Sequence, residues 1–131
     1  MYHLLIPAVQ SLLSATGRFG AVVCGTGSGA YPLANIVLRQ SKPVSGKRIE
    51  ETRLLVQVQS AAGDDSEASY LATLELLTVA KSTLHEARLP GHGARKLQAD
   101  GVETAQIKET GEMIYFIPVS VTVDPDGFTT S

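Results

Sequence analysis

The sequence contains a single cysteine, Cys24, and no tryptophan. One cysteine cannot form an intramolecular disulfide, and the same count excludes a cysteine-rich zinc site. Because Cys24 ends the apolar run at residues 21–24, we expect it to be a small buried residue rather than a reactive thiol. Aromatic residues make up only 5% of the chain, so aliphatic side chains must form most of the core.

An excess of charge of either sign is also missing. The 11 lysines and arginines stand against 13 aspartates and glutamates, which gives a net charge of −2. This near balance argues against a nucleic-acid-binding protein that works by bulk electrostatics. We therefore expect no sequence-specific nucleic-acid partner.

No apolar run is long enough to cross a bilayer, so we expect no membrane partner. Residues 1–15 are mostly apolar, but they lack the basic start of a signal peptide, and Pro7 and Gln10 interrupt them. They predict instead an amphipathic core helix with Pro7 in or near its first turn. The apolar face of this helix would carry Leu4, Leu5, Ala8, Val9 and Leu12.

The clearest pattern lies at residues 52–87, where a strand, a polar turn and a long helix follow one another. The strand alternates, as a period of two requires. One face carries Leu54, Val56 and Val58, and the other carries Arg53, Leu55, Gln57 and Gln59. A strand with these two faces is predicted to cover the core on one side and to meet solvent or another subunit on the other.

The helix that follows should begin near Ser66 and run for about five turns, ending at Pro90 and Gly91. Asp64 and Asp65 precede it, and capping is favoured over acid–base catalysis for this carboxylate pair. Its apolar residues spread over more than half of the circumference: Tyr70, Leu74, Leu76, Leu77, Val79, Ala80, Leu84 and Ala87. A helix that lies on one sheet needs a narrower stripe. We therefore expect it to contact its own sheet and also either the other helix or a neighbouring subunit.

The remaining segments complete an α+β pattern. Strands are predicted at residues 19–24, 33–40, 102–108 and 113–123, exposed turns at 41–50 and 109–112, and a surface loop at 89–100. Pro118 cannot donate a ladder hydrogen bond and therefore marks an edge or a bulge. Helices do not alternate regularly with strands, so we expect a mostly antiparallel sheet with two main helices packed on it and a C-terminal β-hairpin.

No catalytic, metal or cofactor site is predicted. The glycine-rich segment at residues 25–32 lacks the Gly-Lys-Ser/Thr sequence and the following helix of a phosphate-binding loop, so a sharply turned connection is favoured. His3, His85 and His92 are not spaced as metal ligands; His85 should be solvated, and His92 is the one expected to contact a partner. A small domain without a chemical site is better suited to assembly than to catalysis.

The order of these elements resembles the tail terminator (tail completion) proteins of tailed bacteriophages, and in particular the Mu-like type. The resemblance rests on the strand LLVQVQS after a stretch like PLANIVLRQSK, an acidic turn, the helix SEASYLATLELLTVAKSTL, and a terminal hairpin that ends in FIPVSVTV. It covers the chain from about Tyr31 to Val123, and the N-terminal helix fits as well.

This resemblance implies one α+β domain over residues 1–131 that forms a ring, expected to be a homohexamer, on the phage tail tube. Such a ring stops tube polymerisation and joins the tail to head or neck connector proteins, and the genome can pass through it. The implied location is the tail–neck junction of the virion, after assembly in the host cytoplasm. The family has no catalytic residues, so we expect no enzyme and no cofactor.

Two alternatives stay open. One is a head-completion or neck connector protein, and the other is a small phosphate- or nucleotide-binding domain that uses the loop from Gly25 to Gly29. For the assembly hypotheses, subunit contacts are predicted on the outer face of the central strand and on the loop near residues 90–100. The predicted interface residues are Arg53, Gln57, Gln59, His92, Arg95 and Lys96.

Overall fold

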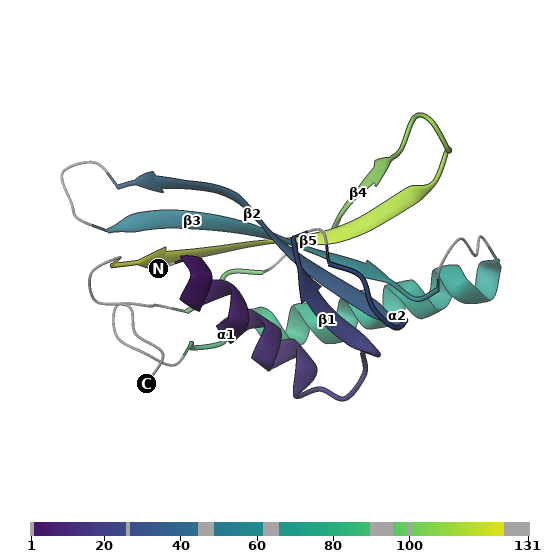
Figure 1. Ribbon diagram of the computed structural model, residues 1–131, viewed down its shortest axis with the longest axis horizontal. Coiled ribbons are helices and arrows are strands. Elements are labelled where there is room, and N and C mark those ends of the chain that lie inside the picture. The colour runs from purple at the N-terminus through teal and green to yellow at the C-terminus, as the bar shows by residue number, and fades with distance from the viewer. Residues whose placement is uncertain are drawn as a thin grey trace.

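The computed structural model describes residues 2–25, 27–44, 49–61, 66–89, 96–99 and 101–124. Two helices and a five-stranded sheet form an α+β fold, as predicted (Figure 1). The elements are α1 (Tyr2–Ser14), β1 (Ala21–Cys24), β2 (Leu33–Pro43), β3 (Glu50–Gln59), α2 (Glu67–Leu84), β4 (Glu103–Gln106) and β5 (Met113–Val123).

The strand order is β1-β2-β3-β5-β4, and each neighbouring pair is antiparallel except β1 with β2. This confirms the mostly antiparallel sheet and the C-terminal hairpin, which β4 and β5 form. The predicted turn at residues 41–50 is too wide, because Ser41 and Pro43 still belong to β2 and pair with Thr52 and Glu50 of β3.

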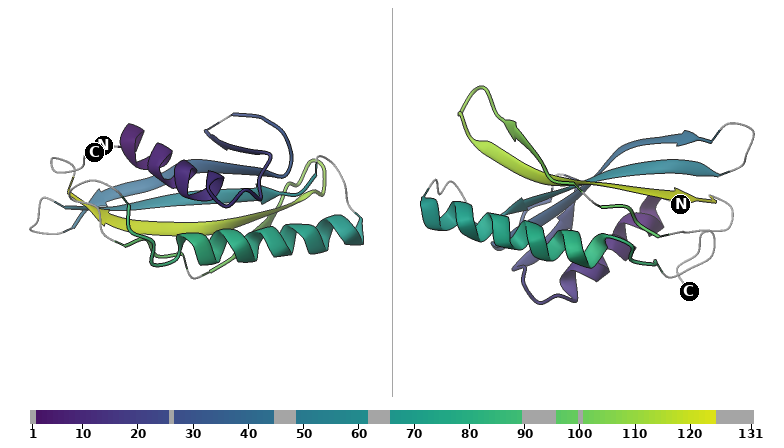
Figure 2. Two further views of the ribbon diagram at one scale, coloured as in Figure 1. Left: turned by 90° about the horizontal axis from the view of Figure 1, so that it is seen from below. Right: turned by 180° about the vertical axis from the view of Figure 1, so that it is seen from behind.

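Both helices lie on the same face of the sheet, and the opposite face is open (Figure 2). In β3, Leu54, Val56 and Val58 are fully buried beneath the helices, which confirms the predicted alternation. The core side chains of α1 are Leu5, Val9 and Leu13, with Leu4, Ala8 and Leu12 packed beside them. The expectation for Pro7 is wrong: α1 already begins at Tyr2, so Pro7 lies in its second turn.

Helix α2 begins as predicted. Ser66 is its N-cap, and the Ser66 hydroxyl accepts a hydrogen bond from the backbone N–H of Ser69 at 3.1 Å. The helix ends at Leu84, however, before the predicted stop at Pro90. The backbone leaves the helical region at His85, and Glu86 has a φ of 64°, which reverses the chain direction. The predicted caps Asp64 and Asp65, and Pro90 and Gly91, lie outside the described residues.

The described residues of the predicted surface loop at 89–100, which are Leu89 and residues 96–99, are partly built into the core. Leu89, Leu97 and Ala99 are buried, and Gln98 exchanges two backbone hydrogen bonds with Ser120 of β5. The backbone N–H of Ala99 also donates to Nδ1 of His85 at 3.1 Å. The expectation of a solvated His85 is therefore wrong, because its half-buried ring holds this segment against the end of α2.

Pro118 occupies an edge position, as predicted. Ser120 directs its N–H and C=O groups toward Gln98, away from β3. Since alternate residues of a strand face the same edge, the nitrogen of Pro118 faces that edge too. It lies between the last residue that β4 pairs, Phe116, and the pairing of Ser120 with Gln98. No ladder hydrogen bond to β3 is lost there.

The parallel pairing of β1 with β2 was not predicted, because the loop between them is short for a parallel connection. The loop packs directly against β1: a Cβ on Gly29 would lie 2.6 Å from Cβ of Ala21. Gly25 has a φ of 65°, which favours glycine at the start of the turn. The expectation for Cys24 is wrong, because this residue ends an edge strand and is exposed.

Candidate assembly surfaces

The N-terminal half of α2 presents apolar side chains that its own chain does not cover. Leu76, Leu77, Ala80 and Leu84 are buried against the sheet and α1. In contrast, Tyr70, Leu71 and Leu74 are exposed by 48%, 55% and 36%. Leu71 lies on the side of the helix away from the sheet, in line with the exposed Glu75 and Thr78. Figure 1 shows that the β4–β5 hairpin also turns away from the helix at this end of the molecule. We call Tyr70, Leu71 and Leu74 the overhang.

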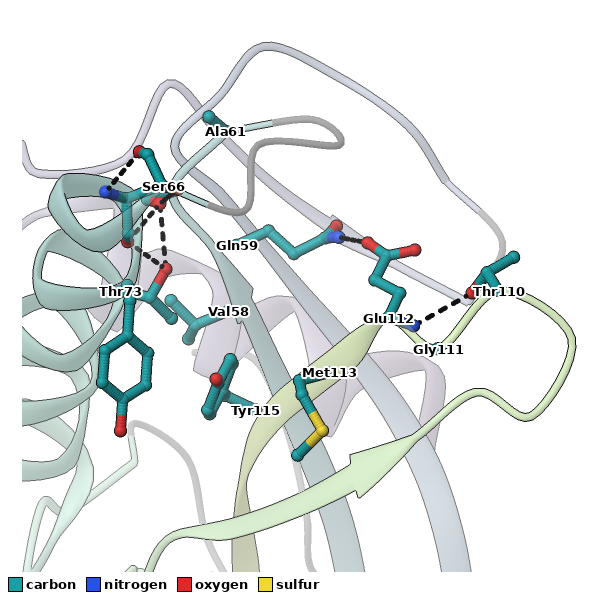
Figure 3. Close-up of a pocket in the computed structure, with 13 residues that line it drawn as sticks. Val58, Gln59, Ala61, Ser66, Thr73, Thr110, Gly111, Glu112, Met113 and Tyr115 are labelled. Carbon is teal, nitrogen blue, oxygen red and sulfur yellow. Dashed lines mark hydrogen bonds between the residues drawn. The ribbon is translucent and has the colours of Figure 1, made fainter.

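A pocket of about 480 Å³ lies where α2 and the hairpin separate (Figure 3). The ring of Tyr70 approaches the ring of Tyr115 on β5, with centroids 5.9 Å apart. Met113, at the start of β5, lines the same pocket and is largely exposed. Tyr70, Met113 and Tyr115 therefore form an apolar lining at one end of the protein, and Leu71 and Leu74 add exposed apolar side chains on the same helix. Surfaces of this kind commonly mark contacts with another protein.

Hydroxyl groups close the inner end of this pocket. The hydroxyl of Thr73 donates to Ser60 at 2.9 Å, and the hydroxyls of Ser60 and Ser69 are 2.8 Å apart. These bonds fasten the start of α2 to the end of β3. Among the described residues that line the pocket, Glu112 is the only carboxylate, and it accepts a hydrogen bond from the side chain of Gln59 at 3.5 Å. The hydroxyls of Ser60, Ser69 and Thr73 bond to one another rather than to this carboxylate.

A second pocket, of about 460 Å³, lies at the opposite end of β5, and we call it the basic pocket. Its lining residues are Glu51, Arg88, Lys96, Gln98, Ser120, Val121 and Thr122. Glu51 is already paired with Arg53, whose guanidinium lies 3.0 Å from the carboxylate. Within the described part of the chain, Arg88 and Lys96 have no ion-pair partner. The pocket is thus rich in hydrogen-bond donors and suits an anionic group.

The open face of the sheet is amphipathic. Strand register places Val37, Leu55 and Pro118 side by side across β2, β3 and β5, and all three are half-buried. On one side this row is flanked by Asn35, Gln57 and Phe116, and on the other by Gln40, Arg53 and Ser120, so its neighbours are mostly polar. A short apolar row within a polar surface is compatible with a protein contact.

The structure divides the predicted interface residues between the two ends of the molecule. Arg53, Gln57 and Gln59 lie on the open sheet face, as their spacing predicts, and Gln59 also lines the apolar pocket. Lys96 lines the basic pocket, at the same end of the sheet as Arg53. Ser120 of β5 pairs with Arg53 on one side and with Gln98, two residues after Lys96, on the other. Arg53 and Gln59 are six positions apart in one strand, or about 20 Å. The predicted residues His92 and Arg95 lie outside the described residues.

Sequence reasoning missed Arg88, Met113 and the role of Glu51. Tyr70 and Leu74 do belong to the broad apolar arc of the helix, but the sequence could not tell which part of that arc stays uncovered.

The described residues contain no group of three or more histidine, cysteine, aspartate or glutamate side chains placed to hold a metal ion. No described helix has both the length and the apolar character needed to span a membrane. The alternative of phosphate binding at the Gly25–Gly29 loop stays a prediction, since Thr26 lies outside the described residues.

No protein-family model matches the sequence, and no curated protein matches it. The fold, in contrast, is similar to that of a chain in a solved structure described as "Virion of native gene transfer agent (GTA) particle". The TM-score is 0.63 at 12% sequence identity, and the match covers 93% of this chain and 96% of the other. The two chains therefore share a fold over almost their whole lengths.

Proposed function

We propose that this protein is a structural subunit of a phage-like virion, and specifically a tail terminator that forms a ring on the tail tube. The observation that carries the proposal is the shared fold with a chain of the gene transfer agent virion over almost the full length of both chains. The terminator assignment is supported by the resemblance of the element order, from the PLANIVLRQSK stretch to the final FIPVSVTV strand, to Mu-like terminators.

The uncovered apolar surface supports assembly as the way in which the protein works. The overhang, Met113 and the row through Leu55 would be costly to leave in water in a protein that acts alone. A ring of identical subunits would cover such surfaces by repeating one contact around an axis. On a tail tube, a closed ring of this kind would end polymerisation and offer its outer side to the neck.

The proposal is tested by combining native mass spectrometry with negative-stain microscopy of the purified protein. We expect a closed ring, with six copies as the expected number. Added to the polymerising tail tube protein of the same virus, the ring should bind tube ends and shorten the tubes. Tubes grown without the protein are the control. A monomer at every concentration that neither binds tube ends nor changes tube length would contradict the proposal.

A head-completion or neck connector is the second candidate. The virion match favours it equally, because the matched structure is described as a virion and the description names no single component. Pull-down against the tube protein and the portal protein of the same virus separates the two. Preferential capture by the portal protein would favour the connector.

A further inference from the structure

The β4–β5 hairpin and the basic pocket carry opposite charges at opposite ends of the molecule. The hairpin projects away from the helices, as Figure 1 and the right view of Figure 2 show. Residues 103–112 contain three glutamates, Glu103, Glu109 and Glu112, against one lysine, Lys108. Glu103 and Glu109 are exposed, and neither has an ion-pair partner within the described part of the chain.

The groups that line the basic pocket are complementary to these carboxylates. Arg88 and Lys96 provide positive charge, and the side chains of Gln98, Ser120 and Thr122 can donate further hydrogen bonds. Charge-assisted hydrogen bonds from arginine and lysine to carboxylates are among the stronger polar contacts in proteins. The one carboxylate in the lining, that of Glu51, is neutralised by Arg53 at 3.0 Å.

A single molecule cannot bring the two regions together. Met113 begins β5 and Thr122 lies next to its last residue, and the nine residue steps of extended strand between them span about 30 Å. The paired strands between them hold this separation fixed. The hairpin of the same molecule therefore cannot reach the basic pocket, whereas the acidic hairpin of a second copy fits it by charge.

We propose that the hairpin tip of one copy, residues 107–112, docks with its carboxylates in the basic pocket of the next copy. The contact is head to tail, because it joins two different surfaces, and repetition of such a contact gives a closed ring or a filament. The inference rests on the proposed function in one respect, since both require self-assembly. It adds which surfaces meet and what chemistry joins them.

Two charge-reversed proteins test this contact. The pocket variant carries Arg88→Glu and Lys96→Glu, and the hairpin variant carries Glu109→Lys and Glu112→Lys. Each alone should place like charges in every junction, and so raise the dissociation constant of self-association by about tenfold or more. Analytical ultracentrifugation measures it, and the wild-type value should also rise with salt because added ions screen the contact.

Mixing the two variants provides the decisive measurement. The acidic hairpin of the pocket variant suits the basic pocket of the hairpin variant, and the reversed hairpin suits the reversed pocket. We expect an equimolar mixture to regain assembly with equal numbers of the two chains, detected by native mass spectrometry. Misfolded variants could not be restored in this way.

A single substitution provides the control for net charge. Lys96→Glu and Arg39→Glu change the net charge by the same amount. Arg39 lies at the bulge of β2 and does not line the basic pocket, so only Lys96→Glu should weaken association.

The outcomes separate this inference from the proposed function. Wild-type rings that tolerate both double variants would overturn the docking contact and leave the ring in place. A wild-type protein that is always monomeric would overturn both. If only the pocket variant lost association, and mixing did not restore it, then the pocket would bind another anion, such as a phosphate group, and the hairpin contact would be wrong.

Discussion

The two halves of α2 have similar apolar content but different surroundings. In the C-terminal half, Leu77 and Leu84 are buried between the sheet and α1. In the N-terminal half, Leu74 lies at the edge of the buried face and is exposed, and Leu71, seven residues before the exposed Thr78, lies on the solvent side of the helix. The same residue type therefore stabilises the fold at one end of the helix and is free for contact with other molecules at the other end. The position of a leucine around and along the helix decides which role it has.

The largest effect on folding is expected from truncation in the buried half. Leu77, only 2% exposed, belongs to the main core cluster. Leu77→Ala should lower the free energy of unfolding by about 2–5 kcal/mol, because it leaves a cavity in addition to the lost transfer energy. Urea unfolding followed by circular dichroism measures this. The matched change Leu71→Ala should cost less than about 1 kcal/mol. Equal losses at the two positions would contradict the comparison.

A smaller effect is expected at the boundary between the two halves, where Thr73 joins α2 to β3. Thr73→Val keeps the shape but removes the hydrogen bond from the Thr73 hydroxyl to Ser60, and should cost about 1 kcal/mol. Thr78→Val is the control, because the exposed Thr78 hydroxyl bonds only to the carbonyl of Leu74 in its own helix. Thermal unfolding should therefore show a lower midpoint for the Thr73 variant than for the Thr78 variant.

The smallest effect on stability, and a clear effect on assembly, is expected in the overhang. Leu71→Ser with Leu74→Ser should change the free energy of unfolding by less than about 1 kcal/mol, because neither side chain is in the core. If the overhang is covered in the ring, the double variant should shift the population toward monomer in size-exclusion chromatography with light scattering. Unchanged assembly would show that the overhang lies outside the subunit contact.

Local patterns in the sequence were sufficient to predict much of this fold. The alternation of Leu54, Val56 and Val58, the cap at Ser66 and the β4–β5 hairpin all depend on residues close in sequence. The open-face position of Arg53 and Gln59 follows from the same period of two.

The features that were missed depend on contacts between distant segments. The parallel pairing of β1 and β2 requires the loop to pack back on Ala21, and no local period signals this. Leu97 and Ala99 are too few to reveal that their segment pairs with β5. The predicted interface residues lie at two ends of the molecule because β3 is long. The exposure of Leu74 depends on the direction in which the hairpin leaves the sheet.

The position of Pro118 has a consequence for how the protein avoids aggregation through its sheet edge. A free sheet edge with an unbroken row of N–H and C=O groups is a template for uncontrolled strand addition and for aggregation. On the outer edge of β5, β4 covers the first part and Gln98 covers Ser120. The residue between them, Pro118, has no N–H to offer. The side chains of this strand can therefore contribute to an ordered assembly, while its backbone does not pair with strands of other chains.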